Sequence, residues 1–129
     1  MTKVVTKLLG AMLLMMAFIF VSPVSSANAD SLVCNVTETM PCIETIDQGD
    51  TLTARFDTGL ELAQVDFTNQ SFSFNAEVNV QDHPPVFIQV QQTVPEVYPV
   101  YGTQALTFTN LSLNPQTPVR LFITGKQYS

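Results

Sequence analysis

Alternation of apolar and polar side chains is the feature that most limits how this chain can fold. The longest alternating run covers residues 71–81, and its apolar side chains occupy every second position: Phe72, Phe74, Ala76, Val78 and Val80. Because successive side chains of a strand point to opposite faces, this period predicts a strand with one face on a core and the other in water. No run of comparable length has the period of an amphipathic helix after residue 29.

Shorter runs with the same period follow along the chain. Their inward positions would be Leu52, Ala54 and Phe56, then Val86, Ile88 and Val90, and finally Val119, Leu121 and Ile123. Gly, Pro, Asn and Asp residues separate the runs and are typical of turns. We detect no internal repeat. The pattern predicts an all-β domain, an immunoglobulin-like β-sandwich of about 7–8 short strands.

The N-terminal segment has a different character from the rest of the chain. Two lysines precede an uncharged apolar run over residues 8–21, and a small-x-small sequence of the kind that signal peptidase recognises ends at Ala29. The apolar run is shorter than the roughly 20 residues of a transmembrane helix. We therefore expect a cleaved signal helix over residues 1–29 and a mature domain over residues 30–129. The domain would have no stable membrane span and would lie in the periplasm, at the cell surface or outside the cell.

The predicted mature domain is strongly acidic. It keeps three of the five basic residues and all eleven acidic ones, which gives a formal charge of −8. An acidic domain repels the phosphate backbone, so a nucleic-acid partner is excluded.

Both cysteines, Cys34 and Cys42, lie in the predicted mature domain. An oxidising compartment and an even number of cysteines predict a disulfide. The spacing is not that of a C-x-x-C redox motif, so a structural bridge is favoured. We expect it to lie across a hairpin whose loop is residues 37–41.

Few side chains offer catalytic chemistry. Asp57-Thr58-Gly59 is similar to the Asp-Thr-Gly motif of aspartic proteases, where two carboxylates share a proton and activate water, but Leu60 replaces the small residue that follows in that family. His83 is the only histidine, and no nucleophile motif accompanies it. We expect the motif to form a turn and His83 to lie in an exposed loop, and we predict no catalytic residue.

Two further sets of side chains suggest alternatives. Three carboxylates would suit calcium if the fold gathered them: Asp47, Asp50 and Asp57. Three asparagines begin matches to the N-glycosylation pattern: Asn35, Asn69 and Asn110. We interpret the carboxylates as surface acids and the asparagine matches as chance, and we predict no metal site and no cofactor.

A proline-spaced stretch holds the best candidate for a binding surface. Tyr98 and Tyr101 lie within residues 94–102, where Pro95 and Pro99 favour an edge strand or an extended loop. Exposed tyrosines beside an open edge are suited to bind a partner strand. We therefore predict that Tyr98 and Tyr101 contact a partner.

These features predict an exported, non-catalytic module for protein binding or assembly in the periplasm or at the cell surface. Its partner would be another exported protein or a second copy of the chain. One alternative is a structural subunit of a surface fibre, because the penultimate Tyr128 and the alternating last strand resemble subunits of chaperone–usher pili. The other alternative is a small secreted enzyme similar to the aspartic proteases.

Overall fold

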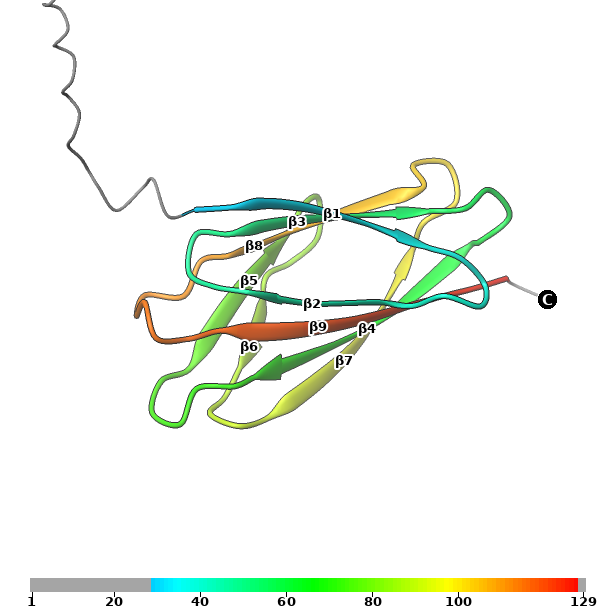
Figure 1. Ribbon diagram of the computed structural model, residues 1–129. Coiled ribbons are helices and arrows are strands. Elements are labelled where there is room, and N and C mark those ends of the chain that lie inside the picture. The colour runs from blue at the N-terminus through cyan, green and yellow to red at the C-terminus, as the bar shows by residue number, and fades with distance from the viewer. Residues whose placement is uncertain (1–28, 128–129) are drawn as a thin grey trace, which may run out of the picture.

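Nine strands form two stacked sheets in the computed structural model, which describes residues 29–127 (Figure 1). The strands are β1 (Ser31–Val36), β2 (Cys42–Ile46), β3 (Thr51–Phe56), β4 (Leu62–Asn69), β5 (Ala76–Val80), β6 (Val86–Ile88), β7 (Thr93–Pro99), β8 (Ala105–Asn110) and β9 (Val119–Lys126). Residues 29–127 contain no helix, so the predicted all-β sandwich is confirmed. The predicted signal helix and Tyr128 lie outside the described residues.

The strands follow the order of a jelly roll. One sheet has the order β1-β3-β8-β5-β6 and the other β2-β9-β4-β7. The antiparallel pairs β5–β6, β4–β7, β3–β8 and β2–β9 nest inside one another, like a single long hairpin that has been rolled up. β1 is an addition to this plan and pairs with β3 in parallel.

This order corrects the predicted immunoglobulin-like type. Of the nine described strands, only β5 and β6 are neighbours both in the chain and in a sheet, whereas an immunoglobulin sandwich contains several such hairpins. Alternation identifies strands and their buried faces. It does not specify which strand pairs with which. Here β2 pairs with β9, although most of the domain's sequence lies between these two strands.

The core lies between the sheets, on the faces that alternation predicts. Inward positions of β3 and β9 are buried: Leu52, Ala54, Phe56, Val119, Leu121 and Ile123. Phe67 of β4 and Phe108 of β8 meet edge to face across the core, with ring centroids 5.9 Å apart. This contact between aromatic rings joins the two sheets at their centre.

The strand expected over residues 71–81 is shorter than predicted. β5 covers only Ala76–Val80, and the two phenylalanines before it are exposed. The Ser71 N–H donates to Asn69 Oδ1 at 2.9 Å, and the Phe74 N–H donates to Ser71 Oγ at 3.0 Å. These local side-chain bonds turn the backbone out of the sheet, although the apolar alternation continues through the turn.

Two buried asparagines brace corresponding corners of the sandwich. Asn69 ends β4, and its Nδ2 donates to the carbonyl of Ile88 in β6 at 3.0 Å and to a second carbonyl. Asn110 ends β8, and its Nδ2 donates to the carbonyl of Ile46 in β2 at 2.9 Å and to a second carbonyl. Each amide thus ties the end of one sheet to a strand of the other, and no buried side-chain polar atom among the described residues lacks a partner.

The two corners come from a short repeat that the sequence analysis missed. Residues 67–71 are Phe-Thr-Asn-Gln-Ser, and residues 108–112 are Phe-Thr-Asn-Leu-Ser. In both copies the asparagine Oδ1 accepts the N–H of the serine. Asn69 and Asn110 are fully buried, so these glycosylation matches cannot receive a sugar in the folded domain, whereas Asn35 is exposed on β1.

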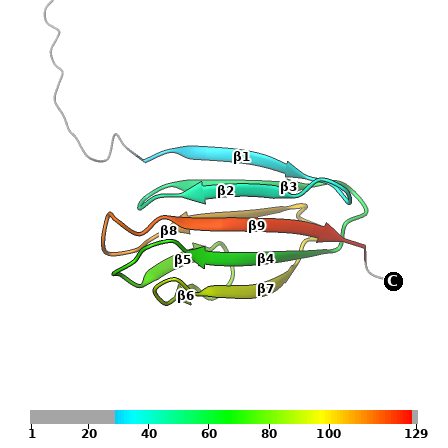
Figure 2. The same cartoon turned by 60° about the horizontal axis from the view of Figure 1, so that its bottom comes forward.

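The predicted disulfide between Cys34 and Cys42 is present, with the two Cα atoms 6.1 Å apart. It does not lie across a hairpin, because β1 pairs with β3 and β2 pairs with β9. The bridge instead joins the edge strands of two different sheets (Figure 2). It therefore closes one long side of the sandwich.

Candidate functional site

The four edge strands are the natural places for a partner strand to add. β1 and β2 lie along one long side of the sandwich, and β6 and β7 lie along the other (Figure 2). An edge strand presents unpaired N–H and C=O groups, and proteins block such edges with prolines, inward-pointing charges or short strands. The four edges of this domain differ sharply in these devices.

The register of β7 on β4 decides which of its backbone groups are free. The Asn69 N–H donates to the Gln92 carbonyl at 3.0 Å, and the Val100 N–H donates to the Glu61 carbonyl at 2.9 Å. Antiparallel partners alternate between hydrogen-bonded and non-hydrogen-bonded pairs. The backbone N–H and C=O groups of the even-numbered residues of β7 therefore point toward β4, and those of the odd-numbered residues point away from the sheet edge.

Prolines and a charge block this outward edge of β7. Pro95 and Pro99 occupy two of its four outward positions, where they remove N–H donors without breaking a bond to β4. Glu96 lies between the inward-facing Val94 and Tyr98, and a charge in that place discourages another strand. β7 is an edge strand, as predicted, but it is poorly suited to strand addition.

The two tyrosines of the predicted surface lie in different environments. Tyr98 is only 5% exposed, and its ring packs edge to face against His83 with centroids 4.8 Å apart. Tyr101 follows β7 and is 67% exposed. Of the pair, only Tyr101 is available to a partner. The two tyrosines are three positions apart, so in an extended chain their side chains point to opposite faces.

Burial raises the pKa of the Tyr98 phenol to about 12, and the Glu96 carboxylate adds to the shift. An unfolded tyrosine titrates near pH 10, so the folded state holds this proton more tightly. The resulting stabilisation is complete below pH 10 and is lost as the pH rises toward 12.

We expect Tyr98→Phe to reduce this alkaline loss of unfolding free energy by about 1–2 kcal/mol. At pH 7 the variant should be nearly as stable as the parent, because the phenol is uncharged at that pH and phenylalanine keeps the buried ring. Urea denaturation at pH 7, 9 and 11 measures both effects. An equal loss of stability in parent and variant between pH 9 and 11 would contradict the assignment.

β1 presents its free backbone groups in a regular row. The Thr51 N–H donates to the Asp30 carbonyl at 2.8 Å, and the Asp57 N–H donates to the Val36 carbonyl at 3.1 Å. The backbone N–H and C=O groups of the even-numbered residues of β1 therefore point toward β3. Those of the odd-numbered residues point away from β3, along the open edge. These outward residues are Ser31, Val33 and Asn35.

β1 also lacks the devices that block the other edges. Its six residues include no proline and no charge, and Val33 is 60% exposed. β2 carries Glu44 on its inward face, between two buried residues. β6 has only three residues and follows Pro84-Pro85. Among the described edges, β1 alone is long, uncharged and free of proline.

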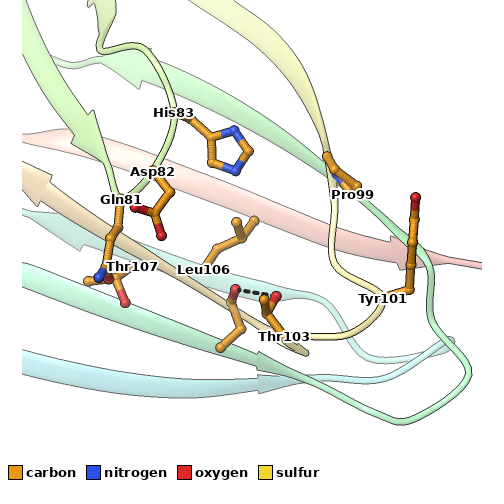
Figure 3. A pocket seen from close by; sticks show the side chains of 9 residues that line it. Gln81, Asp82, His83, Pro99, Tyr101, Thr103, Leu106 and Thr107 are labelled. Carbon is orange, nitrogen blue, oxygen red and sulfur yellow. Dashed lines mark hydrogen bonds between the residues drawn. The ribbon is translucent and has the colours of Figure 1, made fainter.

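A hollow of about 510 Å³, lined by both polar and apolar side chains, lies beside Tyr101 (Figure 3). One wall is the turn after β5, residues 81–83, and the other holds Tyr101 and Thr103 of the loop before β8. The floor is formed by residues 105–107 of β8. The fold thus brings residues 81–83 close to the exposed Tyr101 ring, a proximity that the sequence did not predict.

The candidate catalytic residues occupy a turn and a loop. Asp57-Thr58-Gly59 forms the turn between β3 and β4, where the Leu60 N–H donates to the Asp57 carbonyl at 3.2 Å and Gly59 has a φ of +101°. The turn predicted for this motif is confirmed. His83 is partly buried against Tyr98 rather than in a fully exposed loop.

The three carboxylates considered for calcium do not come together. Asp50 is buried just before β3, where its Oδ1 accepts the Asp30 N–H and its Oδ2 accepts the Asp47 N–H. Asp57 follows the other end of β3, about 20 Å away at the rise of a strand. Asp50 is therefore a turn cap rather than a surface acid. Residues 29–127 hold no group of three or more His, Cys, Asp or Glu side chains that suits a metal ion.

No protein-family model matches the sequence, and no curated protein matches it. Over the part of the chain that the structure describes, no helix is long and apolar enough to cross a membrane.

Proposed function

We propose that this domain is an exported, non-catalytic module that binds a protein partner in the periplasm or at the cell surface by adding a strand of the partner to β1. The observation that carries the proposal is the contrast between edges. β1 offers three outward residues with free N–H and C=O groups, while the other edges carry prolines, inward charges or too few residues.

The side chains beside β1 support the same surface. Val33 on β1 and Met40 on the connecting loop are exposed apolar residues, whereas the exposed Ile43 of β2 lies on the outer face of the other sheet, beside Phe122. We name this surface, formed by β1, the loop after it and β2, the β1–β2 edge. An added strand would gain main-chain bonds from β1 and apolar contact from Val33.

A different protein suits this edge better than a second copy of the chain. The domain from residue 30 carries a formal charge of −8, so two copies repel each other, whereas β1 itself is uncharged. The Cys34–Cys42 bridge also ties β1 to its own domain. β1 is therefore suited to act as a fixed template and poorly suited to be donated to a neighbour, which weighs against the fibre-subunit alternative.

Photo-crosslinking from two matched valines tests the proposal. Val33 on β1 and Val97 on β7 are 60% and 59% exposed, and both lie on edge strands. A photoreactive residue at position 33 of the exported protein should capture one defined partner protein, and the same residue at position 97 should not. Equal capture from both positions would overturn the proposal, and adducts only between copies of the chain would favour the fibre subunit.

A further inference from the structure

The walls of the hollow beside Tyr101 are fixed by unusual backbone conformations. Asp82 and Gln104 have φ values of 66° and 55°, in a region that residues other than glycine seldom adopt. The Gln104 Nε2 donates to the carbonyls of Phe56 and Asp57 at 3.3 and 2.7 Å. On the opposite wall His83 packs against Tyr98. The hollow is therefore formed in advance of any ligand.

The Tyr101 ring stands between two hollows. It lines the hollow of about 510 Å³ and a second one of about 400 Å³, which it shares with Pro99 and Glu61. Figure 3 shows the ring edge-on, with one face turned toward the side where Asp82 and His83 lie. At 67% exposure the ring offers a flat apolar surface that its own domain does not cover.

The polar groups of the first hollow define the ligand chemistry. Gln81, Asp82, Thr103 and Thr107 supply an amide, a carboxylate and two hydroxyls. A purely apolar ligand would strip water from these groups without replacing their hydrogen bonds. Among residues 29–127, no lysine or arginine lines either hollow, and the domain is acidic, so an anionic ligand is repelled.

We infer that this hollow binds a neutral carbohydrate. One face of a sugar ring, which carries C–H groups, would stack on Tyr101, and its hydroxyls would bond Gln81, Asp82 and the threonines. The site is separate from the β1–β2 edge, so the two proposals stand or fall independently. The inference adds a second ligand class to a module that we propose binds protein.

Amide NMR titration with three neutral hexasaccharides tests the inference: maltohexaose, cellohexaose and N-acetylchitohexaose, with oligogalacturonate as the anionic comparison. At least one neutral hexasaccharide should shift the amides of residues 81–83 and 101–107 with saturation. Tyr101→Ala should weaken that binding about tenfold, and Tyr101→Phe should change it less than about threefold, because the stacking face is kept.

Phe87→Ala is the matched control. Phe87 is 66% exposed, like Tyr101, but it lies on β6 and lines neither hollow, so binding should not change. The inference is overturned if no neutral hexasaccharide saturates these amides, if oligogalacturonate binds as tightly, or if Tyr101→Ala binds like the parent. A shift of the same amides by an extended neutral peptide alone would assign the hollow to protein instead.

Discussion

Asn110→Ala is expected to lower the free energy of unfolding by about 3–5 kcal/mol, a large share of the roughly 5–15 kcal/mol typical of a domain. The Asn110 side chain donates to the carbonyls of Ile46 and Thr117 and accepts the Ser112 N–H, and it is fully buried. Alanine removes all three bonds and leaves a small cavity between the sheets. Because the amide joins β8 to the end of β2, the loss also loosens the corner itself.

The repeat supplies both a second test and a control. Asn69→Ala should cost a similar amount, since Asn69 makes the equivalent bonds at the other corner. Asn35→Ala should change stability by less than about 0.5 kcal/mol, because Asn35 is exposed on β1. Urea denaturation at pH 7 measures all three variants. Similar small losses for Asn35 and Asn110 would show that the corners do not depend on these amides.

Removing the disulfide is also expected to have a large effect. Cys34→Ala combined with Cys42→Ala should lower the free energy of unfolding by about 2–3 kcal/mol, since the bridge closes a loop of only eight residues in sequence separation. Reduction of the parent with dithiothreitol should reproduce the loss. A decrease below about 1 kcal/mol would mean that the bridge adds little to the packing of β1.

The loss should be concentrated in β1. Among the described strands β1 pairs with β3 alone, so without the bridge its hydrogen bonds hold it to a single neighbour. Hydrogen exchange should then accelerate at the amides that face β3, those of Leu32, Cys34 and Val36, before it changes in β4 or β9. The same double variant should lose crosslinking from position 33, because β1, to which the partner strand would add, is no longer held in place by the disulfide.

The strands and their buried faces could be predicted from the sequence, because a half-buried strand has alternating apolar and polar side chains. The buried faces of β3 and β9 agree with this alternation. It failed at Phe72 and Phe74, where hydrogen bonds of Asn69 and Ser71 turn the chain away. It could not give the jelly-roll order, because the pairing of distant strands depends on the packing of the whole domain.

The site was less predictable for a related reason. A proline-rich edge at β7 was identified, but whether its prolines block or leave open the edge depends on the register with β4. The openness of β1 depends likewise on which of its residues face β3. The repeat of Phe-Thr-Asn-x-Ser was visible in the sequence and would have identified the two buried corners.

The comparison of positions 33 and 97 tests the central claim most directly. Both valines are equally exposed on edge strands, so they differ mainly in whether their edge can accept another strand. The account predicts a single partner adduct from position 33, at least about tenfold more abundant than any adduct from position 97. Adducts of equal yield from both positions, or from position 97 alone, would contradict it.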